Sequence, residues 1–138
     1  MPLPHLLLSV FQEIESNGDA GSMAGLIEIQ HDARETILLL RIKGRLDHVT
    51  VPQVDRQLLG YIEKWGNASI LIDFSGVSYL SIAGLHLLLD LHKKVKAKSG
   101  YLAIFSINHQ TANVLKITNS DAILNVCKTE EEAFQCCK

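Results

Sequence analysis

The sequence predicts a single α/β domain with a mixed, mostly parallel central sheet of about five strands and four helices. Two β-forming runs separated only by polar residues come first and predict a hairpin. After them, apolar runs typical of buried strands alternate with segments whose apolar residues recur every three or four positions. Strands connected through helices become parallel by right-handed crossovers. A chain of 138 residues with 47% hydrophobic content can bury one core of ordinary size.

The hairpin and the first helix of the domain follow from local patterns. Apolar and polar residues alternate over 26–30, and a buried-strand run covers 36–42, with polar turn residues over 31–35 between them. A helix is expected from about 51 to 65, because apolar residues recur there at helical spacing. Asp47 or a threonine just before this helix can cap its first turn.

The middle of the chain predicts a strand, a turn and a long helix. A β-forming run covers 70–74, turn residues follow over 75–84, and a leucine-rich helix is expected over 85–98. Its last turns carry several lysines, which suit the negative end of the helix dipole.

Four shorter elements are expected to complete the domain. They are a strand over 101–106, a short helix that starts within 108–111, a strand over 123–127, and a closing helix capped by Thr129. The domain itself is expected over 23–138. Residues 1–22 combine a short helical pattern with a linker-like stretch, and we leave open whether they are a native extension or a remnant of cloning.

Composition and charge exclude several classes of function. The formal net charge is −2, so no general field attracts nucleic acid or an anionic membrane. No run of about 18 apolar residues is present, so we expect no insertion into a membrane. The three cysteines, Cys127, Cys136 and Cys137, do not form a disulfide framework, and a reducing cytoplasm is expected. Cys136 and Cys137 are either a reactive or metal-binding pair or ordinary thiols on the last helix.

The usual signatures of catalysis are missing from the sequence. It contains no phosphate-binding glycine loop, no nucleophile elbow and no zinc-binding His-Glu-x-x-His. His86 and Asp90 are four residues apart on the expected long helix, but two ligands do not make a metal site. We therefore expect no enzyme, no cofactor and no bound metal.

Three motifs in order resemble the STAS domain, the module of anti-sigma factor antagonists and of the cytoplasmic tails of sulphate transporters. Residues 44–50, Gly-Arg-Leu-Asp-His-Val-Thr, are similar to the family's Gly-Glu-Leu-Asp-x-x-Thr. Residues 73–85 are similar to its Asp-Leu-x-x-Val-x-x-x-Asp-Ser-Ser-Gly-Leu, and residues 108–129 follow the family's ending. The resemblance covers about 25–134 and implies a STAS-like fold.

The resemblance also implies a missing phosphorylation switch. In the family, the first serine of Asp-Ser-Ser-Gly is phosphorylated by a partner that is both kinase and anti-sigma factor. Here Ile82 stands at that position between Ser81 and Ala83, and it has no hydroxyl group. The chain therefore resembles a family member held in its unphosphorylated, binding-competent form. Ser81 is either the cap of the long helix or a displaced phosphosite.

A partner-binding surface is expected around this loop. Leu87 and Leu89 either join Ile82 in an exposed apolar patch or are covered by another helix. Asp47 either orients the loop, contacts the partner or caps the helix. The residues expected to bind a partner are Asp47, His48, Ser81, Ile82, Ala83, Gly84 and Leu87.

The resemblance implies an anti-sigma factor or a serine kinase-like protein as the partner of a non-enzymatic regulatory module. Three alternatives remain open: a scaffold subunit of a signalling assembly, an accessory subunit of a membrane transporter, and a small-molecule-binding role at the strand ends. Homodimer formation is also left open.

Overall fold

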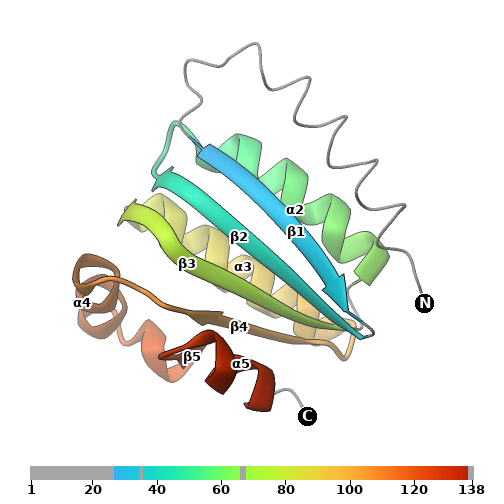
Figure 1. The fold of residues 1–138 in the computed structure, drawn as a ribbon. Helices are drawn as coiled ribbons and strands as arrows, with labels where there is room; N and C mark the ends of the chain where they lie inside the picture. The colour runs from blue at the N-terminus through green and yellow to red at the C-terminus, as the bar shows by residue number, and fades with distance from the viewer. Residues whose placement is uncertain (1–26, 35, 66–67, 137–138) are drawn as a thin grey trace.

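The computed structural model describes residues 27–34, 36–65 and 68–136, and within them it forms one five-stranded sheet with four α-helices (Figure 1). This confirms the predicted fold class. The expected segment 1–22 and the domain boundary at residue 23 lie outside the described residues. The elements are β1 Ile27–Arg34, β2 Ile37–Leu46, α2 Val51–Trp65, β3 Ser69–Leu80, α3 Ile82–Ala97, β4 Tyr101–Phe105, α4 His109–Ile117, the 3-10 turn η2 Ser120–Ala122, β5 Asn125–Cys127 and α5 Glu130–Cys136.

The strands lie in sequence order, β1-β2-β3-β4-β5. β1 is antiparallel to β2, and every later neighbour is parallel, as the hairpin followed by crossovers predicts. The carboxyl ends of β2 and β3 therefore meet at one edge of the sheet, to the left in Figure 1. The loops that follow these strands are brought together there.

Helices cover both faces of the central strands. In β2, Leu38, Leu40 and Ile42 belong to the main core formed with α2 and α3, which lie behind the sheet in Figure 1. Leu39 points the opposite way and packs in a second cluster with Ala133 of α5. Burial on both faces explains why the central strands read as continuous apolar runs instead of alternating patterns.

The strand β3 is longer than the sequence predicts. The turn expected over 75–84 is wrong, because β3 continues to Leu80 and stays paired with β2. Gly44 pairs with Val77 after one register shift, and Leu46 pairs with Leu80 after a second; such shifts bend the pair. This half of the strand contains polar residues and a glycine, so its composition is typical of a turn. It forms a strand because it pairs with β2.

The hairpin turn is also tighter than expected. The polar residues 31–35 are not all turn, since β1 extends through Arg34, which pairs with Ile37 of β2. His31 lies within β1, and its ring centroid is 5.7 Å from that of Tyr61 on α2. A buried partner strand thus holds polar residues in a ladder that their own propensity does not favour.

The last strand is shorter than the predicted 123–127. The backbone N–H groups of Ile123 and Leu124 both donate to the carbonyl oxygen of Ser120, at 3.0 and 2.9 Å. These bonds close the 3-10 turn η2 and delay the start of β5 to Asn125.

One ion pair ties together β2, β3 and α5. Asp73 is buried, and its carboxylate accepts a hydrogen bond from the Arg41 guanidinium and, at 2.8 Å, from the backbone N–H of Ser75. Glu130 Oε1 lies 3.4 Å from the same guanidinium. Burial lowers the pKa of Arg41, but the hydrogen bond to Asp73 and the charges of Glu130 and Asp73 outweigh it and raise the pKa. Arg41 is therefore a fixed cation between β2, β3 and α5.

Replacing Asp73 by alanine is expected to lower the free energy of unfolding by about 2 kcal/mol, because it leaves a half-buried guanidinium and a backbone N–H without their acceptor. Urea denaturation measures the effect. Asp90→Ala is the control: Asp90 pairs with Lys94 at 2.8 Å on an exposed part of α3, and its loss should change stability very little. Equal losses for the two variants would contradict the structural role of Asp73.

Candidate functional site

The candidate site lies where β2 and β3 end and α3 begins. The backbone N–H of Ser81 donates to the carbonyl oxygen of Leu46 at 2.9 Å. This bond joins the motif at 44–50 to the motif at 73–85. Segments about 30 residues apart in sequence thus form one surface, because parallel strands deliver their following loops to the same edge.

Asp47 organises the loop that follows β2. Its Oδ1 accepts hydrogen bonds from the backbone N–H groups of Val49 and Thr50, at 3.0 and 3.2 Å. Thr50 Oγ1 donates to the Arg45 carbonyl at 2.6 Å, which closes the loop. Desolvation raises the pKa of Asp47, but the hydrogen bonds from Thr50, Arg45 and Val49 outweigh it, so the pKa is lowered. Asp47 is an ionised acceptor that orients this loop before α2.

Ser81 is the N-cap of α3. Its backbone is extended, and its Oγ accepts a hydrogen bond from the backbone N–H of Gly84 at 3.2 Å. The interpretation of Ser81 as the helix cap is thereby confirmed, and the helix begins at Ile82, three residues before the leucine-rich run expected over 85–98. A displaced phosphosite at Ser81 stays a prediction.

Gly84 allows α3 to pack against the strand ends. A Cβ atom at this position would lie 2.7 Å from Leu80 Cδ1 and 2.8 Å from the Leu46 carbonyl oxygen. Both distances are shorter than a carbon contact allows. Gly84 is buried, so it serves to position the helix and offers no surface to a partner.

The other expected binding residues differ in exposure. The Ile82 side chain is 54% exposed, His48 is exposed, and Ala83 is half-buried. Leu87 is only 5% exposed and belongs to the main core, so the alternative that places it in an exposed patch is wrong. Leu89 is partly buried against the same core. A helix close to a sheet and two other helices buries more than one apolar stripe.

Two residues join this surface that the sequence analysis did not select. Val49 is 62% exposed at the tip of the Asp47 loop. The guanidinium carbon of Arg45 lies 4.5 Å from the centroid of the Tyr79 ring, and Arg45 Nε lies 3.2 Å from Asp47 Oδ2. The sequence did contain a signal for Arg45, because it is the one residue that departs from the family's Gly-Glu-Leu-Asp signature.

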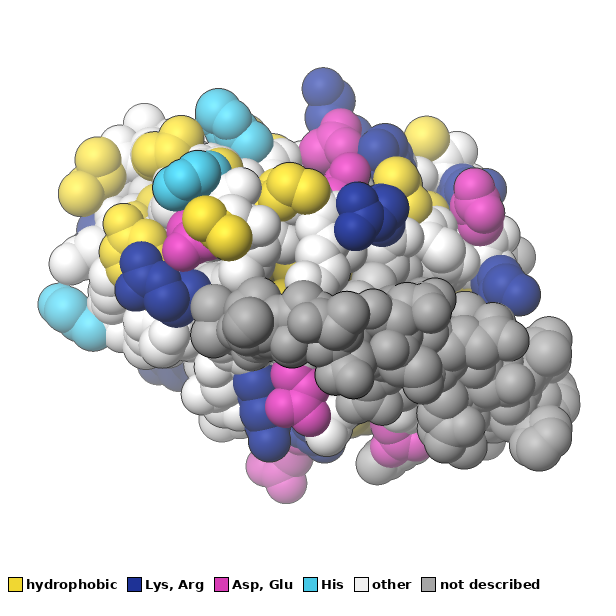
Figure 2. All heavy atoms as spheres, turned by 90° about the horizontal axis from the view of Figure 1, so that it is seen from above, with side chains coloured by type: hydrophobic (Ala, Val, Ile, Leu, Met, Phe, Trp, Pro, Cys, Tyr) yellow, Lys and Arg dark blue, Asp and Glu magenta, His cyan; other side chains and the backbone are white. Residues whose placement is uncertain are grey.

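We call the side chains of Arg45, Asp47, His48, Val49 and Ile82 the loop face. Of its two exposed aliphatic side chains, Val49 lies in the loop after β2 and Ile82 is the first residue of α3. Figure 2 shows hydrophobic and histidine side chains gathered on the left of the molecule, the side on which β2 and β3 end in Figure 1.

The N-terminus of α4 holds the end of β3 in place. Gln110 Oε1 accepts from the backbone N–H of Leu80 at 2.8 Å, and Gln110 Nε2 donates to the Leu80 carbonyl at 2.9 Å. Asn108 caps α4 through Thr111 N–H at 2.8 Å and also donates to the Val77 carbonyl at 3.2 Å. At Leu80, the last residue of β3, the Gln110 amide thus makes the backbone hydrogen bonds that a neighbouring strand would otherwise make.

Residues with metal-binding chemistry are dispersed. Within residues 27–34, 36–65 and 68–136, no three His, Cys, Asp or Glu side chains gather in a way that would hold a metal ion. Asp90 pairs with Lys94 and not with His86. Cys136 Sγ lies 4.0 Å from Cys127 Sγ, and Cys137 lies outside the described residues.

No helix in the described part of the chain has both the length and the apolar character needed to cross a membrane.

Comparison with known proteins identifies the family. A model of the STAS domain matches residues 28–133. The chain belongs to the STAS domain family. The resemblance seen in the three motifs is thereby confirmed.

This STAS domain is similar in sequence or in fold to anti-sigma factor antagonists, and similar in fold to part of an anion transporter. The anti-sigma F factor antagonist of Paenibacillus polymyxa is 22% identical over 108 residues, which cover 78% of this chain and 92% of that protein. The crystal structure of an anti-sigma factor antagonist from Mycobacterium paratuberculosis has a TM-score of 0.73 at 19% identity, over 80% of this chain and 93% of that one. The murine Slc26a9 anion transporter has a TM-score of 0.68 at 13% identity, over 77% of this chain but 18% of that chain.

Replacing Gly84 by alanine is expected to lower the free energy of unfolding by about 2 kcal/mol, because the added methyl group must displace Leu80 or the Leu46 backbone. Gly60→Ala is the matched control: Gly60 lies within α2, and its Cβ would meet nothing within 4 Å. Alanine there should stabilise the helix by about 0.5–1 kcal/mol. Chemical denaturation of both variants measures the contrast, and a neutral Gly84→Ala would show that α3 does not pack as described.

Replacing Ser81 by alanine is expected to cost about 1 kcal/mol of stability through loss of the helix cap. Ser75→Ala, at an exposed position of β3, should cost less than half as much. Thermal melting of the two variants compares them. A Ser81 variant as stable as the wild type would mean that the cap contributes nothing.

Proposed function

We propose that this STAS domain is a non-enzymatic regulatory module that binds an anti-sigma factor or a serine kinase-like protein through the loop face. The observation that carries the proposal is the exposure of Ile82, 54%, as the first residue of α3. The family membership and the relatives that are anti-sigma factor antagonists support the class of partner. No cofactor is needed for this role, and the site of action is the cytoplasm.

The loop face has the composition of a small binding surface. Val49 and Ile82 offer apolar area, and Arg45, Asp47 and His48 supply polar groups beside it. Interfaces commonly place a few apolar anchors inside a polar rim that excludes water. The loops are fixed by backbone hydrogen bonds to Asp47 and Leu46, so little ordering has to accompany binding.

We further propose that the classical serine switch is absent. Ile82 occupies the position of the family's phosphoacceptor and cannot be phosphorylated. The nearest hydroxyl group, that of Ser81, accepts the hydrogen bond that caps α3. A phosphate group would bring a charge of about −1.5 to −2 to the apolar part of the loop face. Because position 82 cannot receive a phosphate group, the protein stays in its binding-competent form.

A role as an accessory unit of a membrane transporter is the second candidate. The specific observation in its favour is the match between 77% of this chain and one part of the murine Slc26a9 anion transporter. Co-purification of the untagged protein with a membrane permease, and not with an anti-sigma factor, would favour this candidate.

Replacing Ile82 by aspartate is expected to weaken binding to the cognate anti-sigma factor by roughly 30-fold, because a charge must then be desolvated at an apolar anchor. Isothermal titration calorimetry measures the affinity, and circular dichroism confirms that the variant is folded. Ile117→Asp is the matched control: Ile117 is 81% exposed on α4 and is not part of the loop face, and the change should leave affinity unaltered. Full binding by Ile82→Asp would exclude the proposed surface.

Replacing Ile82 by serine is expected to restore the switch. With the kinase partner and ATP, the variant should gain one phosphate at position 82 and lose binding, whereas the wild-type protein gains none and stays bound. Mass spectrometry locates the phosphate. Phosphorylation of the wild-type chain at Ser81 under the same conditions would overturn the proposal that the switch is absent.

A further inference from the structure

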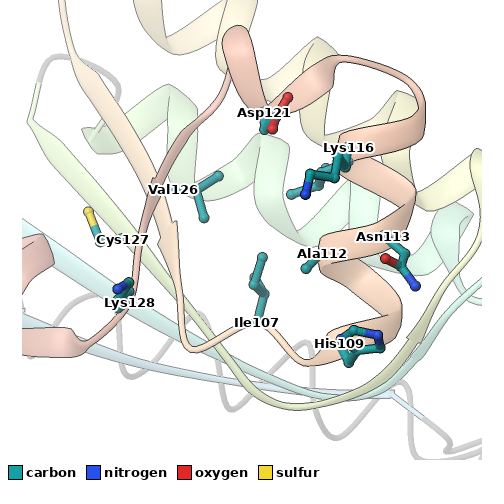
Figure 3. Close-up of a pocket in the computed structure, with 10 residues that line it drawn as sticks. Ile107, His109, Ala112, Asn113, Lys116, Asp121, Val126, Cys127 and Lys128 are labelled. Carbon is teal, nitrogen blue, oxygen red and sulfur yellow. The ribbon is translucent and has the colours of Figure 1, made fainter.

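A groove separate from the loop face lies between α4 and β5. Its volume is about 670 Å³, which falls within the range of about 300–1,000 Å³ typical of small-molecule sites. One wall is α4, and the other consists of β5 and the residues that follow it (Figure 3). The groove opens beyond the carboxyl ends of β4 and β5, where sheets of this kind place ligands.

The floor of the groove is apolar. Ile107, Ala112, Leu115 and Val126 line it, and Val126 is 36% exposed. Among the described residues, five large hydrophobic side chains are exposed, and one of them, Val126, lines the groove.

Cationic side chains stand on the two walls. Lys116 lies on α4 and Lys128 follows β5, and the close-up places them on opposite sides of the groove. Asp121 is the only carboxylate among the lining residues, and it lies on the side of Lys116. Neither lysine forms an ion pair with another described residue. The lining therefore combines an apolar floor with two lysines and one carboxylate.

We propose that this groove binds a small amphiphilic carboxylate. Its apolar body would lie on Ile107, Ala112 and Val126, and its anionic group would pair with Lys128. We choose Lys128 as this partner because Asp121, the lining carboxylate, stands on the side of Lys116. The Glu132 carboxylate also lies beside Lys128, where it accepts a hydrogen bond from the Lys128 backbone N–H at 2.9 Å. The proposal is independent of the protein partner of the loop face.

Three probes separate the parts of this proposal. Titration of the full-length ¹⁵N-labelled protein with decanoate, below its micelle concentration, should give saturable NMR shifts at residues 107, 112 and 126. The neutral analogue 1-decanol should bind more weakly, and acetate, which lacks the apolar body, should cause no saturable shifts. Shifts spread evenly over the surface, or equal shifts with acetate, would overturn the proposal.

Two variants and a control test the residues. Lys128→Ala should weaken decanoate binding by about two- to fivefold, as expected for one exposed ion pair, and leave 1-decanol binding unchanged. Val126→Glu should weaken it by more than tenfold, because it places a negative charge on the apolar floor. Lys98→Ala, which removes an exposed lysine after α3, is the matched control and should have no effect. Equal decanoate affinities for the Lys128 and Lys98 variants would show that Lys128 does not bind the carboxylate.

Discussion

The parallel pairing of β2 with β3 is the interaction on which the rest of the structure depends. It runs from Ile37 and Ser69 to Leu46 and Leu80, through two register shifts. Because the pairing continues to Leu80, the chain enters α3 directly beside the end of β2, where Leu46 accepts the Ser81 N–H. The main core on one face and the Arg41–Asp73 ion pair on the other hold this pair of strands from both sides. This pairing is what brings the two loops of the candidate site together.

Much of this architecture could be predicted from the sequence, because its dominant signals are local. Helix α2 begins and ends where apolar periodicity predicts, and the five-strand order follows from a hairpin and successive crossovers. The predictions are wrong where pairing with another strand determines the secondary structure. The second half of β3 contains Ser75, Gly76 and Ser78, residues typical of turns, and only the ladder of β2 makes them a strand.

The candidate site was predicted less completely, for a related reason. The motifs identified Asp47, Ser81 and Ile82, since those positions depend on sequence order alone. Exposure depends on the tertiary fold, which buries Leu87 and leaves Val49 in solvent. The Gln110 contact with Leu80 has no sequence signal, because a glutamine that completes a backbone ladder resembles any polar residue near a helix start. Side-chain contacts with distant backbone are the part of a site that patterns do not reveal.

The Gln110 amide has a consequence for how forces pass through the domain. Two hydrogen bonds to the backbone of Leu80 make the first turn of α4 and the end of β3 a single mechanical unit. Any tilt of α4 must either break both bonds or carry Leu80, and with it the start of α3, along. The groove and the loop face are therefore both supported by the contacts that Gln110 and Asn108 make with the end of β3.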